Sequence, residues 1–308
     1  MRARTPRDPA RARRRRRRAR FLITFLSPAI VLYSVFVLWP YAQSFYIALT
    51  QWRGVSANRT FIGLANFEKL VSDPNFWNAL GHNGLMLIAL PAATIGLALF
   101  FAALFAQGGR TVRGAGFYRV VFFAPQVMSV VAIGLIWSFV FHPTIGLLNG
   151  ALSAAGLDGL KRTWLGDPDT VLWAIALVVV WQAVGFYMVL FIAGMQAIPM
   201  SLYEAATLDG ASRWQAFWRI TLPLLWGHVR TALVFISIGA LDLFAIVQVM
   251  TRGGPNRASD VVALFMYETA FSFSDFGYAT AIGVALLLMT LTLAVLMLKA
   301  TQREHIEY

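Results

Sequence analysis

The stretch EAATLDGASRWQAFWRITLP, residues 204–223, decides the fold. It is polar, carries four charged side chains, and separates two long apolar runs. The pattern predicts a helix over 201–209, a break at Gly210, and a second helix over 211–222. Glycine suits the left-handed conformation that ends a helix, and Pro223 can begin the next helix but not lie deep inside one. A rigid polar segment between two membrane spans is expected to present a docking surface to a soluble partner.

The fixed residues of this stretch resemble the cytoplasmic signature loop of permease subunits from bacterial binding-protein-dependent ABC importers. The shared pattern is E-A-A, three residues, G, nine residues, then I-x-L-P. Every fixed position is present: Glu204, Ala205, Ala206, Gly210, Ile220, Leu222 and Pro223. An ordinary amphipathic loop helix is the other interpretation, and the agreement at all of these positions argues against it.

Composition indicates an integral membrane protein. The chain is 58% hydrophobic and only 13% charged, whereas soluble domains average about 25% charged. Its net charge of +12 is concentrated in residues 1–20, which hold eleven arginines and one aspartate. We expect a basic, disordered cytoplasmic arm there, which sets topology and touches anionic lipid headgroups. A nucleic-acid patch is the alternative, but the apolar chain behind the arm disfavours it, so no nucleic-acid partner is expected.

Six stretches have the roughly 20 mostly apolar residues that a membrane span needs. They lie at about 21–49, 80–106, 118–141, 171–197, 223–250 and 278–300. We therefore expect a transmembrane domain over 21–300, a coupling loop at 198–222, and a cytoplasmic C-terminal tail over 301–308. With both termini inside, 19 Lys and Arg residues are cytoplasmic and 7 are outside, although without the arm the balance is 8 to 7. The positive-inside rule favours this orientation, which puts loop 198–222, called the elbow below, in the cytoplasm.

Other blocks extend the resemblance over most of residues 60–300. GLANFEKL (63–70) is similar to the first outer loop of sugar-type permeases, and FYRVVFFAPQVMSVVAIGLIWSFVFHPTIGLLN (117–149) to their third span and the turn after it. TRGGPNRASD (251–260) is similar to the T-G-G-G-P segment after the fifth span, with Arg252 where glycine is usual. Together these blocks resemble the carbohydrate branch, of the subunit type in maltose, lactose and glycerol-3-phosphate importers.

The resemblance implies an all-α integral membrane fold, a six-transmembrane-helix ABC importer permease core with a cytoplasmic coupling-helix loop, in the bacterial inner membrane. It implies three kinds of partner: a second homologous permease subunit in a heterodimer, two ATP-binding subunits, and an extracytoplasmic solute-binding protein. The sequence has no G-x-x-x-x-G-K-[ST] phosphate loop, so we expect no enzymatic activity and no cofactor in this chain. ATP and Mg would be held by the ATPase partners. The four histidines lie in different segments, and no metal site is expected.

The elbow residues are expected to couple the spans to the ATPases. The candidates are Glu204, Ala205, Ala206, Asp209, Gly210 and Arg213. The glycine permits the turn, the alanines permit close packing against a partner, and Glu204 and Arg213 suit charge contacts. Arg219 is expected to be a solvated surface residue. When the ATPases close on ATP, the elbow would move as a rigid body with its two attached spans.

Asp242 is the acidic residue that we expect well inside a span, where a charge is costly unless it faces water or the bundle interior. Carboxylates bind sugar hydroxyls well, so Asp242 is a candidate for the solute path. Pairing with a polar group of the partner subunit is the alternative. Weaker path candidates are Gln248 and Gln182, and the aromatic side chains Trp181, Phe186 and Trp137, which suit the apolar faces of sugar rings but are also ordinary packing residues.

These observations predict a permease subunit that imports a mono- or oligosaccharide. Glycerol-3-phosphate or another polyol derivative is the alternative solute, and the apparent lack of a buried Lys or Arg in the path disfavours it. An ion-coupled secondary carrier is a further alternative. Such carriers use several intramembrane ionisable groups, whereas Asp242 stands nearly alone, and they have no need of the elbow.

Overall fold

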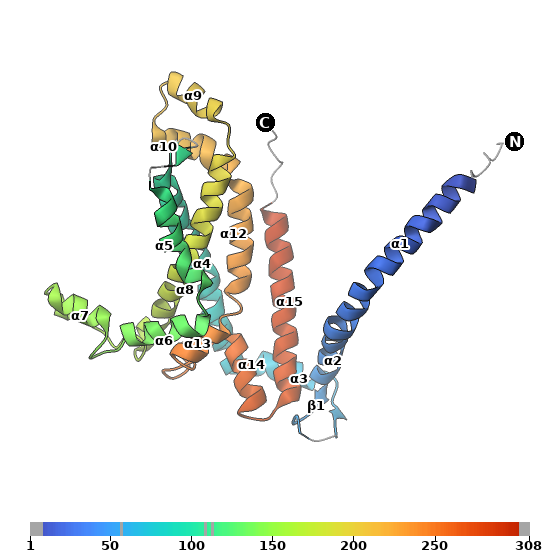
Figure 1. Ribbon diagram of the computed structural model, residues 1–308. Coiled ribbons are helices and arrows are strands. Elements are labelled where there is room, and N and C mark those ends of the chain that lie inside the picture. The colour runs from blue at the N-terminus through green and yellow to red at the C-terminus, as the bar shows by residue number, and fades with distance from the viewer. Residues whose placement is uncertain (1–8, 56–57, 108–109, 112–113, 302–308) are drawn as a thin grey trace.

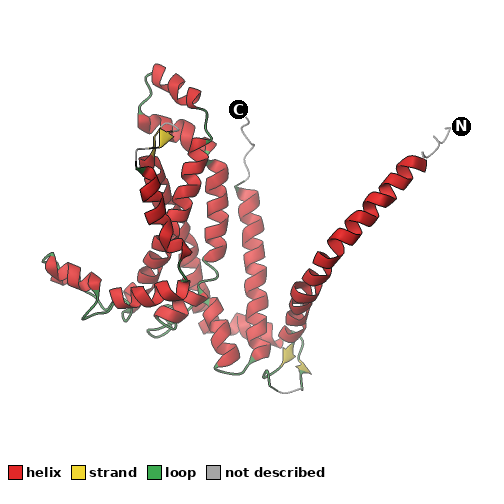
Figure 2. Ribbon diagram, viewed as in Figure 1, coloured by secondary structure: helices red, strands yellow, loops and turns green. Residues whose placement is uncertain are grey.

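The computed structural model describes residues 9–55, 58–107, 110–111 and 114–301. Helices make up most of this part of the chain, and its strands are short (Figure 2). β1 (Thr50–Gln51) pairs antiparallel with β2 (Thr60–Phe61), and β3 (Ala106–Gln107) pairs antiparallel with β4 (Arg110–Thr111). The all-α fold expected from the sequence is confirmed.

Four helical stretches of the described chain are long and apolar enough to cross a membrane. They are Phe21–Ala48, α4 (Pro74–Phe105), α8 (Pro168–Gln196) and α15 (Phe276–Ala300). Two bent helix pairs raise the number to six if each counts as one span. The pairs are Gly116–Val127 with Val130–Val140, bent by 100°, and Arg213–Leu224 with Trp226–Gly239, bent by 67°. The protein is therefore a multi-pass membrane protein, and when each bent pair is counted as one span, two of its six spans are broken.

The elbow lies at one end of the helix bundle, at the top of Figure 1. The opposite end, called the far end below, carries β1, α3 (Ala65–Ser72) and α14 (Val262–Phe271). The connection between the third and fourth spans is also there. It forms α7 (Leu147–Ala154), which projects away from the bundle, and the 3-10 turn η2 (Asp158–Leu160).

The first span packs on α15 only near the far end, through α2 (Trp39–Ala48), while α1 (Pro9–Tyr33) leans away from the rest of the bundle (Figure 1). It is built from α1, the π-helical segment η1 (Ser34–Leu38) and α2, and no residue of its most apolar stretch is buried. The helix already begins at Pro9, so residues 9–20 are helical where a disordered arm was expected. Proline suits the first turn of a helix and arginine is a good helix former, which accounts for the difference. Residues 1–8 lie outside the described chain.

The third span is not the continuous helix expected over 118–141. α5 (Ala115–Val127) ends where Met128 and Ser129 are extended, and α6 (Val130–Val140) leaves at 100°. Pro125 removes a backbone donor near this end and so weakens the last turn of α5. As a result α6 lies across the bundle rather than along it (Figure 1).

The fifth span is also shorter than the expected 223–250. α12 (Trp226–Gly239) ends before a turn at residues 240–243, and α13 (Phe244–Met250) then runs in another direction, beside α6 (Figure 1). The packing between α6 and α13 is close, because a methyl group added to Gly134 would lie 2.9 Å from Cγ1 of Val249. Hydropathy did not reveal this break, since the turn is as apolar as the helices around it apart from Asp242.

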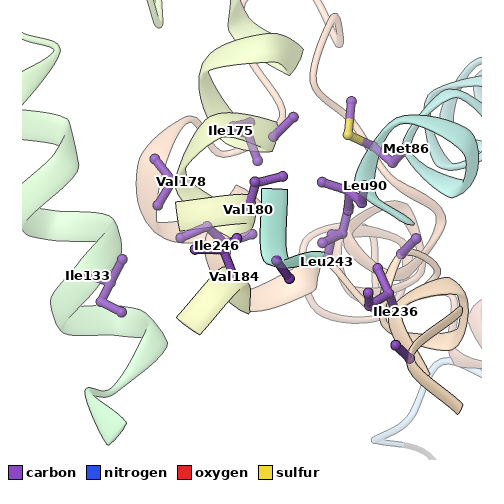
Figure 3. Packing of buried hydrophobic residues seen from close by; sticks show 14 of the residues in the cluster. Met86, Leu90, Ile133, Ile175, Val178, Val180, Val184, Ile236, Leu243 and Ile246 are labelled. Atoms are coloured by element: carbon purple, nitrogen blue, oxygen red, sulfur yellow. The ribbon is translucent and has the colours of Figure 1, made fainter. Parts of the chain in front are cut away.

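The core forms where α4, α8, α12 and α13 meet. Figure 3 shows its aliphatic side chains interdigitating, among them Leu90 from α4, Val184 from α8 and Ile236 from α12. α5 packs on α8 at closer range, because a methyl group on Gly185 would lie 1.7 Å from the carbonyl oxygen of Phe122. Small residues at such crossings allow the backbone contact that holds membrane helices together. This core gives the elbow a fixed base.

Candidate functional site

The first half of the elbow is the helix–glycine break predicted from the sequence. α9 spans Met200–Leu208, and Gly210 follows with a left-handed φ of +76°. The amide of Gly210 donates to the carbonyl of Thr207, and the amide of Ala211 donates to that of Ala206. These bonds satisfy carbonyls that the end of a helix would otherwise leave unpaired. The sequence prediction at Gly210 is confirmed.

The second half of the elbow starts later and runs further than predicted. Ser212 caps it in a capping box, with its Oγ accepting from the Gln215 amide (3.3 Å) while the Gln215 side chain accepts from the Ser212 amide (2.8 Å). The helix then passes through α10 (Arg213–Ala216), the π-helical η3 (Phe217–Thr221) and α11 (Leu222–Leu224). Pro223 thus lies in the last turn before the bend and does not begin the next long helix, which starts at Trp226.

One hydrogen bond braces the two halves of the elbow against each other. The hydroxyl of Tyr203 on α9 lies 2.9 Å from Oγ1 of Thr221, which is only 5% exposed. A partly buried bond of this kind is costly to leave unmade on the side of the buried Thr221. We infer that α9 and the return helix keep a fixed relative position.

The base of the elbow is tied to three spans. A methyl group on Gly194 would lie 2.4 Å from Cδ1 of Leu225, so α8 and the start of α12 are in direct contact. Two α12 side chains also cap the last span: Arg230 Nη2 donates to the carbonyl of Leu298 (2.7 Å), and Trp226 Nε1 donates to that of Thr301 (3.1 Å). The base of the elbow is therefore in contact with α8 and with α12, and α12 in turn is hydrogen-bonded to the end of α15.

The candidate coupling residues lie on the surface of the elbow. Glu204, Ala205, Asp209, Gly210 and Arg213 are exposed, and Ala206 is half-buried. The sequence interpretation missed two apolar side chains beside them, Leu208 (89% exposed) and Trp214 (69% exposed). A single helical wheel would have shown Leu208 on the same surface as the charged residues.

A cavity of about 1020 Å³ lies between the elbow and the bundle. Its lining combines Glu204, Ala206 and Arg213 of the elbow with apolar side chains from α4 and α8, such as Phe100 and Met195. Three of the six coupling candidates, Glu204, Ala206 and Arg213, thus line a hollow under the elbow.

Asp242 occupies the turn between α12 and α13, not the middle of a helix. Its amide donates to the carbonyl of Gly239 (3.0 Å), and the residue is exposed. Within the described chain its carboxylate makes no hydrogen bond or ion pair. The break in the span therefore presents a free acceptor at a point where the backbone is itself non-helical. Broken helices of this kind are tolerated in membranes where they line a cavity or are covered by protein.

The aromatic path candidates are only partly brought together. Trp137 of α6 and Trp181 of α8 meet edge to face, with ring centroids 5.3 Å apart, while Phe186 contacts Phe123 at 6.3 Å instead. Gln182 and Gln248 are half-buried. In the described residues no ring contact, hydrogen bond or ion pair joins Asp242 to the tryptophan pair.

A buried acid, Asp260, was missed by the sequence interpretation. It is 1% exposed and lies in the far-end loop between α13 and α14, where its Oδ2 accepts from Nη1 of Arg257 (2.6 Å). Burial raises its pKa to about 6, against the opposing effect of the Arg257 charge and with the help of nearby Glu268. Its position at the end of the block TRGGPNRASD, residues 251–260, is the sequence signal that could have identified this residue.

The chain belongs to the family of binding-protein-dependent transport system inner membrane components, whose pattern matches residues 95–303. It is 40% identical to the diacetylchitobiose uptake system permease protein NgcF of Streptomyces coelicolor, over 96% of this chain and 87% of that protein. It is 32% identical to the lactose transport system permease protein LacF of Rhizobium radiobacter, over 90% and 93%. It is 31% identical to the sn-glycerol-3-phosphate permease protein UgpA of Agrobacterium fabrum, over 87% and 90%.

The fold is that of a solved bacterial ABC transporter involved in import of the acidic polysaccharide alginate. A chain of that structure superposes with a TM-score of 0.78 at 24% identity, covering 94% of this chain and 98% of its own. The family, and with it the class of transporter permease subunits, agrees with the resemblance drawn from residues 204–223.

Proposed function

We propose that the chain is one of two permease subunits of an ATP-driven importer and forms half of the path for a mono- or oligosaccharide. The observation that carries this is the braced elbow: an exposed helix held by Tyr203–Thr221 and seated on α8 and α12. Such a body converts a push from a soluble partner into movement of spans. The coupling residues would be Glu204, Ala205, Ala206, Asp209, Gly210 and Arg213, and ATP and Mg would be bound by the partner ATPases.

The first span supports the pairing with a sister permease. Phe21–Ala48 is mostly apolar, and none of its most apolar stretch is buried within this chain. A second subunit would cover it and would face the free carboxylate of Asp242 across the path. The elbow would lie in the cytoplasm and the far end would face the solute-binding protein, with both termini in the cytoplasm.

A neutral sugar is the solute that the path candidates fit best. Asp242 would provide an acceptor for hydroxyl groups, and Trp137 with Trp181 would provide an apolar aromatic surface for the C–H face of a sugar ring. Relatives named for diacetylchitobiose and lactose uptake agree with this choice. Glycerol-3-phosphate is the second candidate, because the UgpA relative is named for it.

The test is ATPase activity of the reconstituted importer with its sister permease, ATPases and binding protein. Each solute class is added in turn to the wild type and to a Gly210→Pro variant. Proline cannot adopt the φ of +76° at this position. The matched control is Gly156→Pro, at a far-end glycine with φ +74° and equally open surroundings. Sugar should stimulate the wild type and the control but not the Gly210 variant. Equal stimulation of all three would refute coupling through the elbow.

A further inference from the structure

We propose that Asn83 of α4 is a positioning residue for the solute path. Its side-chain amide is hydrogen-bonded to Ala240 and to Val262, which are the two ends of the segment that carries Asp242. The inference rests on the proposed role of Asp242 in that path. Asn83 is 0% exposed inside an apolar span. An unpaired amide in such a place is strongly unfavourable, so the hydrogen-bond partners of Asn83 indicate its role.

Both partners of Asn83 are helix ends that lie far away in the sequence. Its Nδ2 donates to the carbonyl of Ala240 (2.8 Å), at the end of α12. Its Oδ1 accepts from the amide of Val262 (2.9 Å), the first residue of α14. A helix leaves its last carbonyls and first amides unpaired, and within a membrane these groups need protein partners. One side chain thus caps two helices.

The chemistry of the two contacts makes asparagine hard to replace. A backbone carbonyl can only accept and a backbone amide can only donate, so the residue at position 83 must offer a donor and an acceptor on one short stem. Ionised aspartate keeps the acceptor for Val262 but sets an oxygen against the Ala240 carbonyl. Leucine leaves both groups unpaired.

Asp242 lies two residues beyond the point held by Asn83. Among the described hydrogen bonds, the turn at 240–243 has no other side-chain anchor. Its remaining bonds run between backbone groups, for example from the amide of Leu241 to the carbonyl of Ile238 and from that of Asp242 to Gly239. Removing the donor at Asn83 therefore frees the turn, and the carboxylate moves with it.

Neighbouring polar residues of α4 hold other parts of the segment and supply a control. Asn78 Nδ2 donates to the carbonyl of Arg257 (3.0 Å), and His82 Nδ1 lies 2.8 Å from the carbonyl of Asp260. Both contacts are in the far-end loop and not at the Asp242 turn. Asn78→Ala thus removes a similar amide contact from the same helix without releasing the turn.

The first measurement reads the position of residue 242 directly. The chain has no cysteine, so Asp242→Cys can be labelled by a water-soluble thiol reagent in the assembled importer, with partner subunits made cysteine-free. We expect Asn83→Asp to change the labelling rate at least about fivefold and Asn78→Ala to leave it within twofold. Equal rates in all three backgrounds would overturn the inference.

The second measurement uses unlabelled protein and follows the solute dependence of transport. Asn83→Asp should raise the solute–binding-protein concentration for half-maximal uptake by about the same factor as Asp242→Asn. The double variant should be no worse than the more affected single variant. If the factor for the double variant equals the product of the two single-variant factors, Asn83 acts independently of Asp242, and the inference is contradicted. If no sugar drives uptake by the wild type, the proposed function fails instead, and the labelling result still decides the role of Asn83.

Discussion

Gly210 and Gly156 offer a matched pair at the residue scale, because both have a left-handed backbone and open space around them. Alanine at either position costs about 1–2 kcal/mol of backbone strain. We expect Gly210→Ala and Gly156→Ala to lower the Tm of the purified complex by similar amounts. Solute-stimulated ATPase activity should fall only in the Gly210 variant, at least about threefold. Equal losses of activity would mean that strain alone, and not the elbow, accounts for the effect.

Asp260 gives a prediction about pH. Its pKa is raised in the folded protein to about 6 from an ordinary value of 3.8, so the folded state binds the proton more tightly than the unfolded state. The resulting stabilisation is complete below about pH 4 and is lost as the pH rises through 6. Wild-type protein should therefore gain stability over Asp260→Asn on going from pH 7.5 to pH 5, by about 1–2 kcal/mol. Thermal unfolding of both proteins at the two pH values checks this, and a wild type that loses stability relative to Asp260→Asn on going to pH 5 would contradict it.

The Tyr203–Thr221 contact acts at the scale of the element, since it joins α9 to its return helix. Tyr203→Phe and Thr221→Val each remove the hydrogen bond, and each should weaken coupling between solute and ATPase activity. Because both remove the same bond, the double variant should resemble the single variants, with an interaction energy of about 0.5–1.5 kcal/mol in unfolding. Fully additive effects would show that the bond does not brace the elbow.

α5 and α8 can cross in backbone contact because Gly185 has no side chain. A methyl group there would overlap the Phe122 carbonyl at 1.7 Å, so Gly185→Ala should force the helices apart and reduce the yield of folded complex severalfold. Gly84→Ala on α4 meets nothing within 4 Å and is the control. Fluorescence-detected size-exclusion chromatography of the two variants checks the difference. Normal yield of Gly185→Ala would contradict this packing.

Sequence patterns predicted the elements where the signal is local, and missed what depends on direction or distance. The break at Gly210 could be predicted because glycine spacing and polarity are written in one short stretch. The turns after Val127 and Gly239 could not, because hydropathy records how apolar a segment is and not where its axis points. Asn83 was missed for another reason: its contacts join residues more than 150 positions apart. The arrangement of the solute-path candidates is therefore the least predictable feature of the site. It depends both on the direction of the helix axes and on contacts between residues that are far apart in the sequence.

At the scale of the whole molecule, the central claim is that the elbow, α8 and α12 move as one body. Spin-label distances in the reconstituted importer test it most directly, since the cysteine-free chain accepts labels at chosen pairs. One pair joins Leu208 of α9 to Phe235 of α12, both exposed, and the other joins Leu208 to Trp39 of the first span. Between the nucleotide-free and ATP-trapped states, we expect the first distance to stay constant and the second to change. A change in the first distance would show that the elbow flexes on its spans, and would contradict the account.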